Sequence, residues 1–173
     1  MASRRTTALL ACLVLLGGLS VVAGDVYEAP PTLTVTNEDD TTYRVTAYTA
    51  ESRQAALLMN FEVTTREGER RLATLSQLYW PEGFRNVTLA DDGIPTERIT
   101  VEPGEEVTTT IDGWTPGNVT VYLVEDLGDD RTHVHTTIRT CTERQQEHSL
   151  TLEDGGTSGS ATCASSVDWL LPN

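Results

Sequence analysis

The sequence predicts an all-β fold, a two-sheet sandwich of about eight or nine short strands. Short segments with an apolar side chain at every second position recur along the chain, and turn-forming residues separate them. Threonine is also abundant, with 28 of the 173 residues. A period of two is typical of a half-buried strand, and β-branched threonine fits a pleated surface. Together these observations indicate strands stacked in two layers.

The expected strands can be followed in order by their apolar positions. The clearest alternating face comprises Leu57, Met59, Phe61 and Val63. The other alternating sets are Leu33/Val35, Tyr43/Val45/Ala47, Val87/Leu89, Ile99/Val101, Val107/Ile111, Val119/Val121/Leu123, Val134/Ile138 and Leu150/Leu152. Runs such as Asp91-Asp92-Gly93 and Pro116-Gly117-Asn118 supply the turns between strands. The Gly-Ser composition of residues 154–160 predicts a flexible loop.

Residues 67–79 depart from the strand pattern. Leu72, Leu75, Leu78 and Tyr79 are spaced by three and four residues, which is the spacing of one helix face. Trp80-Pro81 would end such a helix, because the residue before a proline disfavours helical geometry. We therefore expect a short helix or a loop near 67–79.

The first 24 residues predict an export signal. Arg4 and Arg5 precede an apolar run from Ala8 to Gly24 that closes with small residues. The run is near the lower limit for crossing a bilayer, so an uncleaved signal-anchor helix is the alternative. Either way, residues 25–173 should lie outside the membrane, secreted or at the cell surface, and touch it only through an uncleaved N-terminal segment. Residues 25–31 read as an extended linker and 32–173 as a single domain.

The charge is strongly acidic. Twelve basic residues, all arginine, face 26 acidic ones, for a net charge of −14. This excess excludes nucleic acid as an expected partner, because phosphate backbones need cationic side chains. An acidic chain without lysine resembles the exported proteins of extreme halophiles, in which molar salt would screen the repulsion. The alternative is an acidic secreted protein of a mesophile.

Two segments carry a family resemblance. ITVEPGEEVTTTI from Ile99 and GNVTVYLVED from Gly117 resemble the strand–Pro-Gly–strand pattern of immunoglobulin-like modules on prokaryotic cell surfaces. The likeness implies an immunoglobulin-like sandwich with an adhesion, envelope or spacer role. It implies no fixed set of site residues, and the Cys…Trp…Cys spacing of antibody-type domains is absent from the sequence.

Two cysteines follow the signal, Cys141 and Cys163. Outside the cytoplasm an even pair predicts a disulfide, worth about 3 kcal/mol for a loop of this length. Free thiols or metal ligands are the alternatives.

Three histidines lie close together in the sequence. His133 and His135 should point to one face of a strand, and His148 could join them from a neighbouring strand. Such a set can bind copper or zinc. The alternative places these side chains on the polar side of the sheet.

Asn86-Val87-Thr88 and Asn118-Val119-Thr120 are candidate glycosylation sequons. No G-x-S-x-G, H-E-x-x-H or C-x-x-C motif occurs in the sequence, so we expect no enzyme activity and no cofactor. The sequence thus favours a non-enzymatic exported module that binds or spaces an unknown cell-envelope or extracellular protein or glycan. A metal-binding surface protein is the second interpretation.

Overall fold

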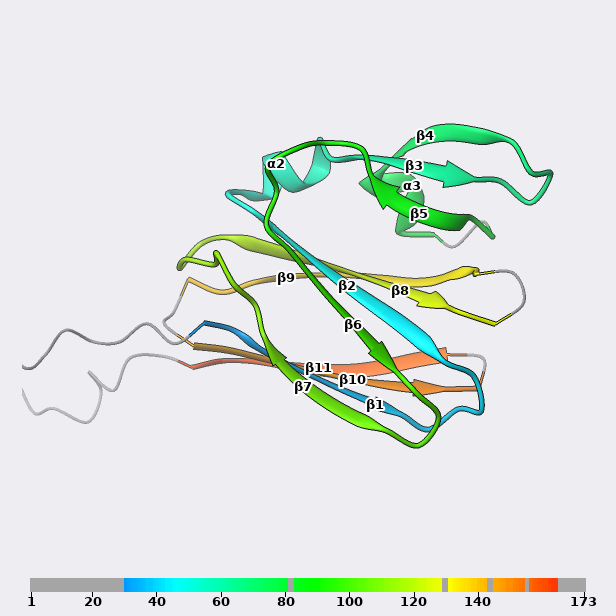
Figure 1. Cartoon of the computed structure of the whole chain (residues 1–173). Coiled ribbons are helices and arrows are strands. Elements are labelled where there is room, and N and C mark those ends of the chain that lie inside the picture. The colour runs from blue at the N-terminus through cyan, green and yellow to red at the C-terminus, as the bar shows by residue number, and fades with distance from the viewer. Residues whose placement is uncertain (1–29, 81–82, 129–130, 143–144, 155, 165–173) are drawn as a thin grey trace, which may run out of the picture.

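The computed structural model describes residues 30–80, 83–128, 131–142, 145–154 and 156–164. Within them the chain forms eleven strands and two short helices. The expected signal or anchor (1–24) and most of the linker (25–31) lie outside the described residues. Figure 1 shows three layers, of which the lower two are the sheets of the predicted sandwich. No helix in the described part is long and apolar enough to cross a membrane.

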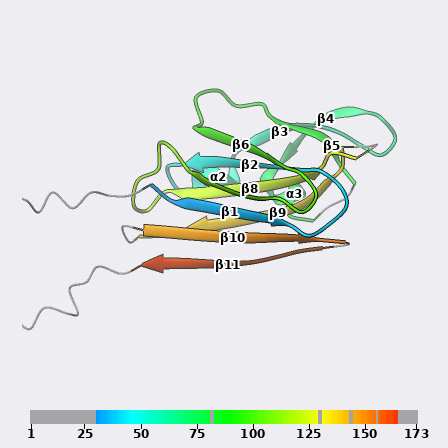
Figure 2. The ribbon, with the colours of Figure 1, turned by 60° about the horizontal axis from the view of Figure 1, so that its bottom comes forward.

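The sandwich consists of two four-stranded sheets. Sheet A has the order β11-β10-β1-β7, from Gly156–Ala164, Gln145–Glu153, Thr32–Asn37 and Glu106–Thr110. Sheet B has the order β6-β2-β8-β9, from Thr96–Val101, Tyr43–Ala50, Val119–Asp126 and His133–Thr140. All neighbouring strands are antiparallel except β1 and β10, which are parallel. Figure 2 shows β1, β10 and β11 of sheet A lying side by side.

The inner core lies between sheets A and B. Alternate residues of the facing strands fill it, as a period of two requires. Its buried members are Leu33, Val35, Tyr43, Val45, Ala47, Val101, Ile111, Tyr122, Val124, Leu150 and Leu152. Most of these are the apolar positions that the sequence assigned to strands. The immunoglobulin-like, two-sheet prediction is therefore confirmed.

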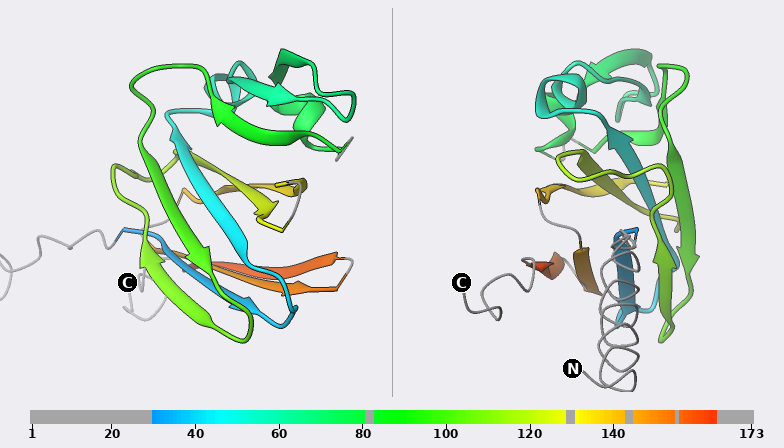
Figure 3. Two further views of the ribbon diagram at one scale, coloured as in Figure 1. Left: turned by 45° about the vertical axis from the view of Figure 1, so that its right-hand side comes forward. Right: turned by 90° about the vertical axis from the view of Figure 1, so that its left-hand side faces the viewer.

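A third layer covers the other face of sheet B. Sheet C has the order β4-β3-β5, from Arg70–Thr74, Asn60–Thr64 and Arg85–Leu89. Helices α2 (Arg53–Leu57) and α3 (Leu75–Leu78) lie beside it (Figure 3). The outer core between this layer and sheet B includes Met59, Phe61, Leu75, Leu78, Phe84, Val121 and Leu123. Two of its strands, β3 and β5, were expected from the sequence; the strands that were not expected are β4 in this layer and β11 in sheet A.

Strand β8 belongs to both cores. Tyr122 and Val124 face the inner core, whereas Val121 and Leu123 face the outer core. All residues from Val119 to Glu125 are consequently buried. The buried Glu125 forms an ion pair with Arg44, whose guanidinium donates to the carboxylate at 2.7 Å. The backbone N–H of Val87 donates to the same carboxylate at 3.2 Å.

The expected helix near 67–79 is shorter than predicted. Residues Arg70–Thr74 instead form β4, which pairs with β3 from Asn60↔Thr74 to Thr64↔Arg70. Only Leu75–Leu78 is helical, and a capping box between Thr74 and Gln77 starts it. Leu75 and Leu78 are buried, but Leu72 is exposed. The three-and-four spacing therefore spans two elements rather than one helix face.

The strand expected to start at Leu57 begins later. Leu57 is the last residue of α2, whose N-cap Ser52 accepts a hydrogen bond from the Ala55 N–H at 3.1 Å. Met59, Phe61 and Val63 are buried as predicted. Alternation alone did not show that Leu57 lies outside this face.

The predicted flexible loop at 154–160 is also wrong for most of its length, because Gly156–Ala164 forms β11. It pairs with β10 from Gln145↔Ala164 to Glu153↔Gly156. Gly159 permits the close packing of this hairpin, since a Cβ there would lie 2.7 Å from the Ser149 carbonyl oxygen.

Candidate functional site

His133, the first candidate metal ligand, joins α3 to β9. Its side chain is buried, and Nε2 lies 2.9 Å from the Leu78 carbonyl oxygen. The Thr136 hydroxyl donates to the same oxygen at 2.8 Å. Burial lowers the pKa of His133, so the ring is neutral near pH 7. Its visible role is to satisfy the C-terminal carbonyl of a one-turn helix.

His148 is buried in the inner core rather than placed on a polar surface. Its Nδ1 donates to the Ser160 carbonyl oxygen at 2.8 Å, which ties β10 to β11. The ring packs against Tyr122 with centroids 4.8 Å apart. Burial lowers the pKa of His148 to about 4. Nε2 has no partner among the described residues.

His135 is partly buried, and its pKa is lowered by desolvation first and then by His133 and Arg139. In the part of the chain that the structure describes, no three His, Cys, Asp or Glu side chains are arranged to hold a metal ion. The expectation of polar-side histidines does not fit His133 and His148, because both are about 1% exposed.

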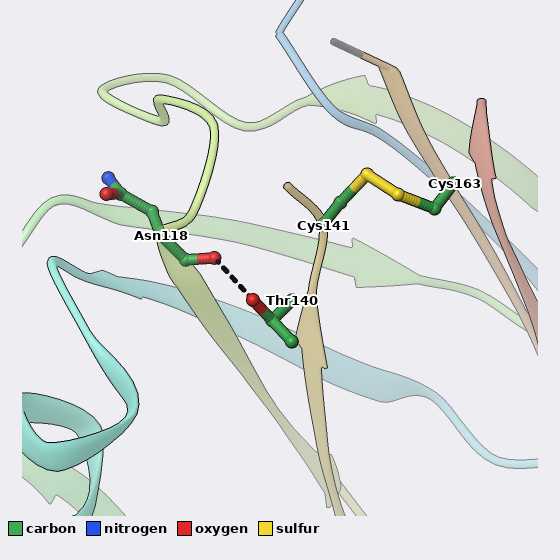
Figure 4. Close-up of a disulfide and its surroundings, with 4 residues drawn as sticks. All are labelled: Asn118, Thr140, Cys141 and Cys163. Carbon is green, nitrogen blue, oxygen red and sulfur yellow. Dashed lines mark hydrogen bonds between the residues drawn. A yellow bond between two sulfur atoms is a disulfide. The ribbon is translucent and has the colours of Figure 1, made fainter. Parts of the chain in front are cut away.

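A disulfide joins Cys141 to Cys163, with 5.7 Å between their Cα atoms. Cys141 follows β9 and Cys163 lies in β11, so the bond links sheet B to sheet A (Figure 4). In the same view the Thr140 hydroxyl donates to the Asn118 carbonyl oxygen at 3.3 Å. The end of β9 is thereby fixed to both β8 and β11.

The two sequons differ in exposure. Asn86 and Thr88 are both exposed on β5. The Asn118 side chain accepts a hydrogen bond from Thr115 at 3.1 Å, and Thr120 is fully buried. The folded chain therefore presents the first sequon and conceals the hydroxyl of the second.

The main candidate binding site is a groove between α2, α3 and the end of β9. It has a volume of about 590 Å³. Apolar side chains from these elements and from β8 line it, namely Leu57, Leu75, Tyr79, Trp80, Val119 and Ile138. Below we call it the β9 groove. It exists because two one-turn helices cover sheet B only partly.

The rim of the β9 groove exposes large apolar side chains. Trp80 is 72% exposed and Tyr79 51% exposed, and their rings pack edge to face with centroids 5.7 Å apart. Leu57 is also exposed on the groove, and Leu58 next to it is 68% exposed. Contiguous exposed apolar patches are typical of interaction surfaces, and aromatic side chains are enriched where such surfaces bind partners.

The charge of the β9 groove is opposite to that of the chain. Arg53 and Arg139 line it, and none of the described lining residues is acidic. A second cavity of about 440 Å³, near the β1–β2 turn, has four aspartates in its lining: Asp39, Asp40, Asp126 and Asp154. In a chain with a net charge of −14, the β9 groove is therefore the surface suited to an anionic ligand.

Sequence reasoning missed this groove. The signal that could have revealed it is a pair of apolar doublets, Leu57-Leu58 and Tyr79-Trp80. Each doublet lies where a one-turn helix ends, and both of its members are exposed. The predicted histidine site, in contrast, is divided between two cores, since His133 bonds to Leu78 of the outer core and His148 contacts Tyr122 of the inner core.

Comparison with known sequence families gives one match. The family described as "Halobacterial Ig domain protein" matches residues 1–172, which is nearly the whole chain. No curated protein matches.

Solved structures offer distant likenesses. The lipoprotein TssJ1 of the type VI secretion system from Pseudomonas aeruginosa has a TM-score of 0.42 at 13% identity, over 79% of this chain and 98% of that one. The human-specific toxin intermedilysin has a TM-score of 0.35 at 8% identity, over 78% of this chain and 23% of that one. Suilysin from Streptococcus suis has a TM-score of 0.27 at 10% identity, over 78% and 23%. Scores this low carry no functional conclusion.

Proposed function

Because the chain belongs to the halobacterial Ig domain protein family, we propose that it is a non-enzymatic module that acts outside the cell and binds a partner through the β9 groove. The observation that carries this proposal is the exposed Tyr79–Trp80 pair beside an apolar groove. Contiguous exposed apolar patches are uncommon on monomers without a partner, and aromatic side chains dominate binding energy where they become buried. The partner belongs to the cell envelope or its surroundings, as a protein or a glycan.

The metal-binding alternative has less support. His133 and His148 each donate a hydrogen bond to a backbone carbonyl oxygen within a core, and both are neutral near pH 7 because burial lowers their pKa. The two rings lie in different cores, and the described residues include no group of three side chains that could hold a metal ion. The hydrogen bonds that these rings form with backbone carbonyl oxygens explain their positions.

The groove is tested by binding to cell envelopes. Protein purified from its producing cells is mixed with washed envelopes of the same cells, and the bound fraction is measured after sedimentation. We expect Trp80→Ala to weaken binding at least about tenfold, as for an aromatic hot spot. The control is Leu72→Ala, since Leu72 is similarly exposed (62%) but lies on β4 outside the groove. Equal binding by wild type and Trp80→Ala would refute the assignment.

Cell fractionation tests the proposed location of the chain outside the cell. Fractionation should find residues 25–173 outside the cell membrane, and mass spectrometry of the N-terminus should distinguish cleavage near Gly24 from a retained anchor. Full-length protein confined to the cytoplasm contradicts the proposal.

A salty surrounding is the remaining part of the proposal. The net charge of −14 destabilises the compact state by self-repulsion at low ionic strength. We expect the melting temperature, followed by circular dichroism, to rise between about 0.1 M and 2 M KCl, because the Debye length falls to about 3 Å near 1 M. A flat or falling curve would leave only an acidic exported domain.

A further inference from the structure

Strand β9 is an edge of sheet B, and only its first half is covered. Near its start the N–H of His133 donates to the Phe84 carbonyl oxygen at 2.7 Å, and Thr136 bonds to Leu78. Residues 137–140, in contrast, line the β9 groove and pair with β8 on one side only. Among the residues that the structure describes, no second strand forms backbone hydrogen bonds with them. An edge of this kind is a template for another strand.

The register indicates which backbone groups face the groove side. The N–H of Gly117 donates to the Cys141 carbonyl oxygen at 2.8 Å, so residue 141 directs its carbonyl at the β8 side of the strand. Backbone groups alternate in direction along an antiparallel strand. Ile138 and Thr140 therefore direct their N–H and C=O groups away from β8. In agreement, the Ile138 carbonyl oxygen accepts a hydrogen bond from Nη1 of Arg139 at 3.3 Å rather than from β8.

We propose that the β9 groove binds an extended, acidic segment of a partner polypeptide, which adds to β9 at residues 137–140 as a fifth strand of sheet B. The inference rests on the proposed function and names the chemistry of its partner. Strand addition supplies affinity through main-chain hydrogen bonds, while alternate side chains supply specificity. A glycan lacks the regular alternation of donors and acceptors that the edge offers.

The two faces of the added strand meet different chemistry. Ile138 lies opposite Val121 and packs on the outer core, so its face continues into the apolar groove beside Leu57 and Trp80. Arg139 lies opposite Thr120, on the other face of the sheet. An added segment that alternates apolar and acidic residues thus places the apolar ones in the groove and the acidic ones beside Arg139.

Charge complementarity favours carboxylates over other polar groups at this edge. Arg139 is partly buried, and its Nε has no hydrogen-bond partner among the described residues. Arg53 approaches from α2, and the described lining holds no carboxylate to neutralise either arginine. A carboxylate accepts bidentate bonds from a guanidinium, which makes the contact stronger than a neutral hydrogen bond. A basic segment would place its cationic side chains beside the like charge of Arg139 instead.

The test uses the full chain, purified from its producing cells, and a capped hexapeptide of alternating leucine and glutamate. Binding is measured by fluorescence anisotropy at a KCl concentration where circular dichroism shows the folded protein. We expect saturable binding that is at least about tenfold tighter than that of the leucine–lysine counterpart. Arg139→Gln should weaken it several-fold, whereas Arg70→Gln, which removes an exposed arginine paired with Glu62 on sheet C, should leave it unchanged. Equal binding of the acidic and basic peptides, or equal effects of the two substitutions, overturns the proposal.

Backbone methylation tests strand addition itself. One peptide is N-methylated on its leucines and another on its glutamates. Since alternate N–H groups of an added strand point to β9, one series should lose at least about tenfold in affinity and the other should retain it. Retention by both or loss by both overturns strand addition.

Other occupants have distinct signatures. Deletion of residues 165–173 should not change peptide affinity, and a rise of tenfold or more would instead assign the groove to the chain's own C-terminal segment. The free protein should sediment as a monomer, and a dimer lost in Trp80→Ala would assign the groove to a second copy. If binding to envelopes depends on Trp80 but the acidic and basic peptides bind equally, this inference alone is overturned. If Trp80→Ala leaves binding to envelopes unchanged, the proposed function is overturned.

Discussion

The two faces of sheet B are covered in different ways. Sheet A, with four strands, covers the inner face, whereas three short strands and two one-turn helices cover the outer face. The inner core is closed tightly enough to bury polar groups such as those of Tyr122, Gln146 and His148. The outer layer is too small to cover its apolar groups, and Tyr79 and Trp80 remain exposed at its border. A small covering layer thus leaves apolar side chains exposed beside a groove, whereas a large one closes a sandwich core.

The largest expected effect tests whether the two cores unfold together. Phe61 is fully buried in the outer core and packs edge to face against Tyr48 at 5.6 Å. Phe61→Ala should lower the free energy of unfolding by about 3–5 kcal/mol. Because β8 belongs to both cores, we expect one transition with a lower midpoint, by urea denaturation followed with circular dichroism. A matched inner-core variant, Leu33→Ala, should shift the same transition. An early, separate transition in Phe61→Ala alone would show that the outer layer is an independent unit.

The next largest effect concerns the disulfide that links sheet B to sheet A. The Cys141–Cys163 disulfide closes a loop with a sequence separation of 22 and links β9 to β11. Replacing both cysteines with serine should lower the free energy of unfolding by about 3 kcal/mol, chiefly because the unfolded chain gains freedom. Hydrogen exchange should quicken in β11 more than in β3. Unchanged stability in the double variant would show that the bond adds no constraint.

Acid should weaken the inner core through His148. Its pKa in the folded state is about 4, below the ordinary 6.5. A histidine with a lowered folded pKa contributes stability that is fully present above about pH 6.5 and is lost as the pH falls toward 4, since the unfolded chain binds the proton first. Between pH 7 and pH 5 the loss from this residue should be about 2 kcal/mol.

Urea unfolding at the two pH values measures this loss, and His133 and His135 add to it because their pKa values are also lowered. His148→Asn, whose amide can still donate to the Ser160 carbonyl oxygen, should have a correspondingly smaller pH dependence. An identical pH dependence in this variant would place the effect elsewhere.

The smallest expected effect lies at the β9 groove. Trp80 is 72% exposed, so Trp80→Ala should change the free energy of unfolding by no more than about 0.5 kcal/mol. A thermal melt beside wild type gives the measurement. A loss above 2 kcal/mol would mean that Trp80 supports the fold, and its exposure would no longer indicate a partner.

Sequence reasoning performed differently in the two halves for a physical reason. In the sandwich, Leu33/Val35 and Leu150/Leu152 alternate because one face of each strand is buried, and a period of two records that burial directly. The Gly-Ser stretch escaped this reasoning, because small side chains carry no apolar signal although β11 pairs along its full length with β10. In the outer layer, Leu72 and Leu75 share a helical spacing but belong to β4 and α3.

The sequence by itself determined the strand-rich sandwich, the acidic charge, the family resemblance and the pairing of two cysteines that had no other partner beyond the signal. Local spacing and composition encode these properties, since each depends on near neighbours or on counts. Only the tertiary structure decided that the histidines lie in separate environments, that Gly156–Ala164 is a strand and that Leu57, Trp80 and Ile138 line one groove. These residues are far apart in the chain, and their meeting depends on how three layers pack over β8, which no local pattern records.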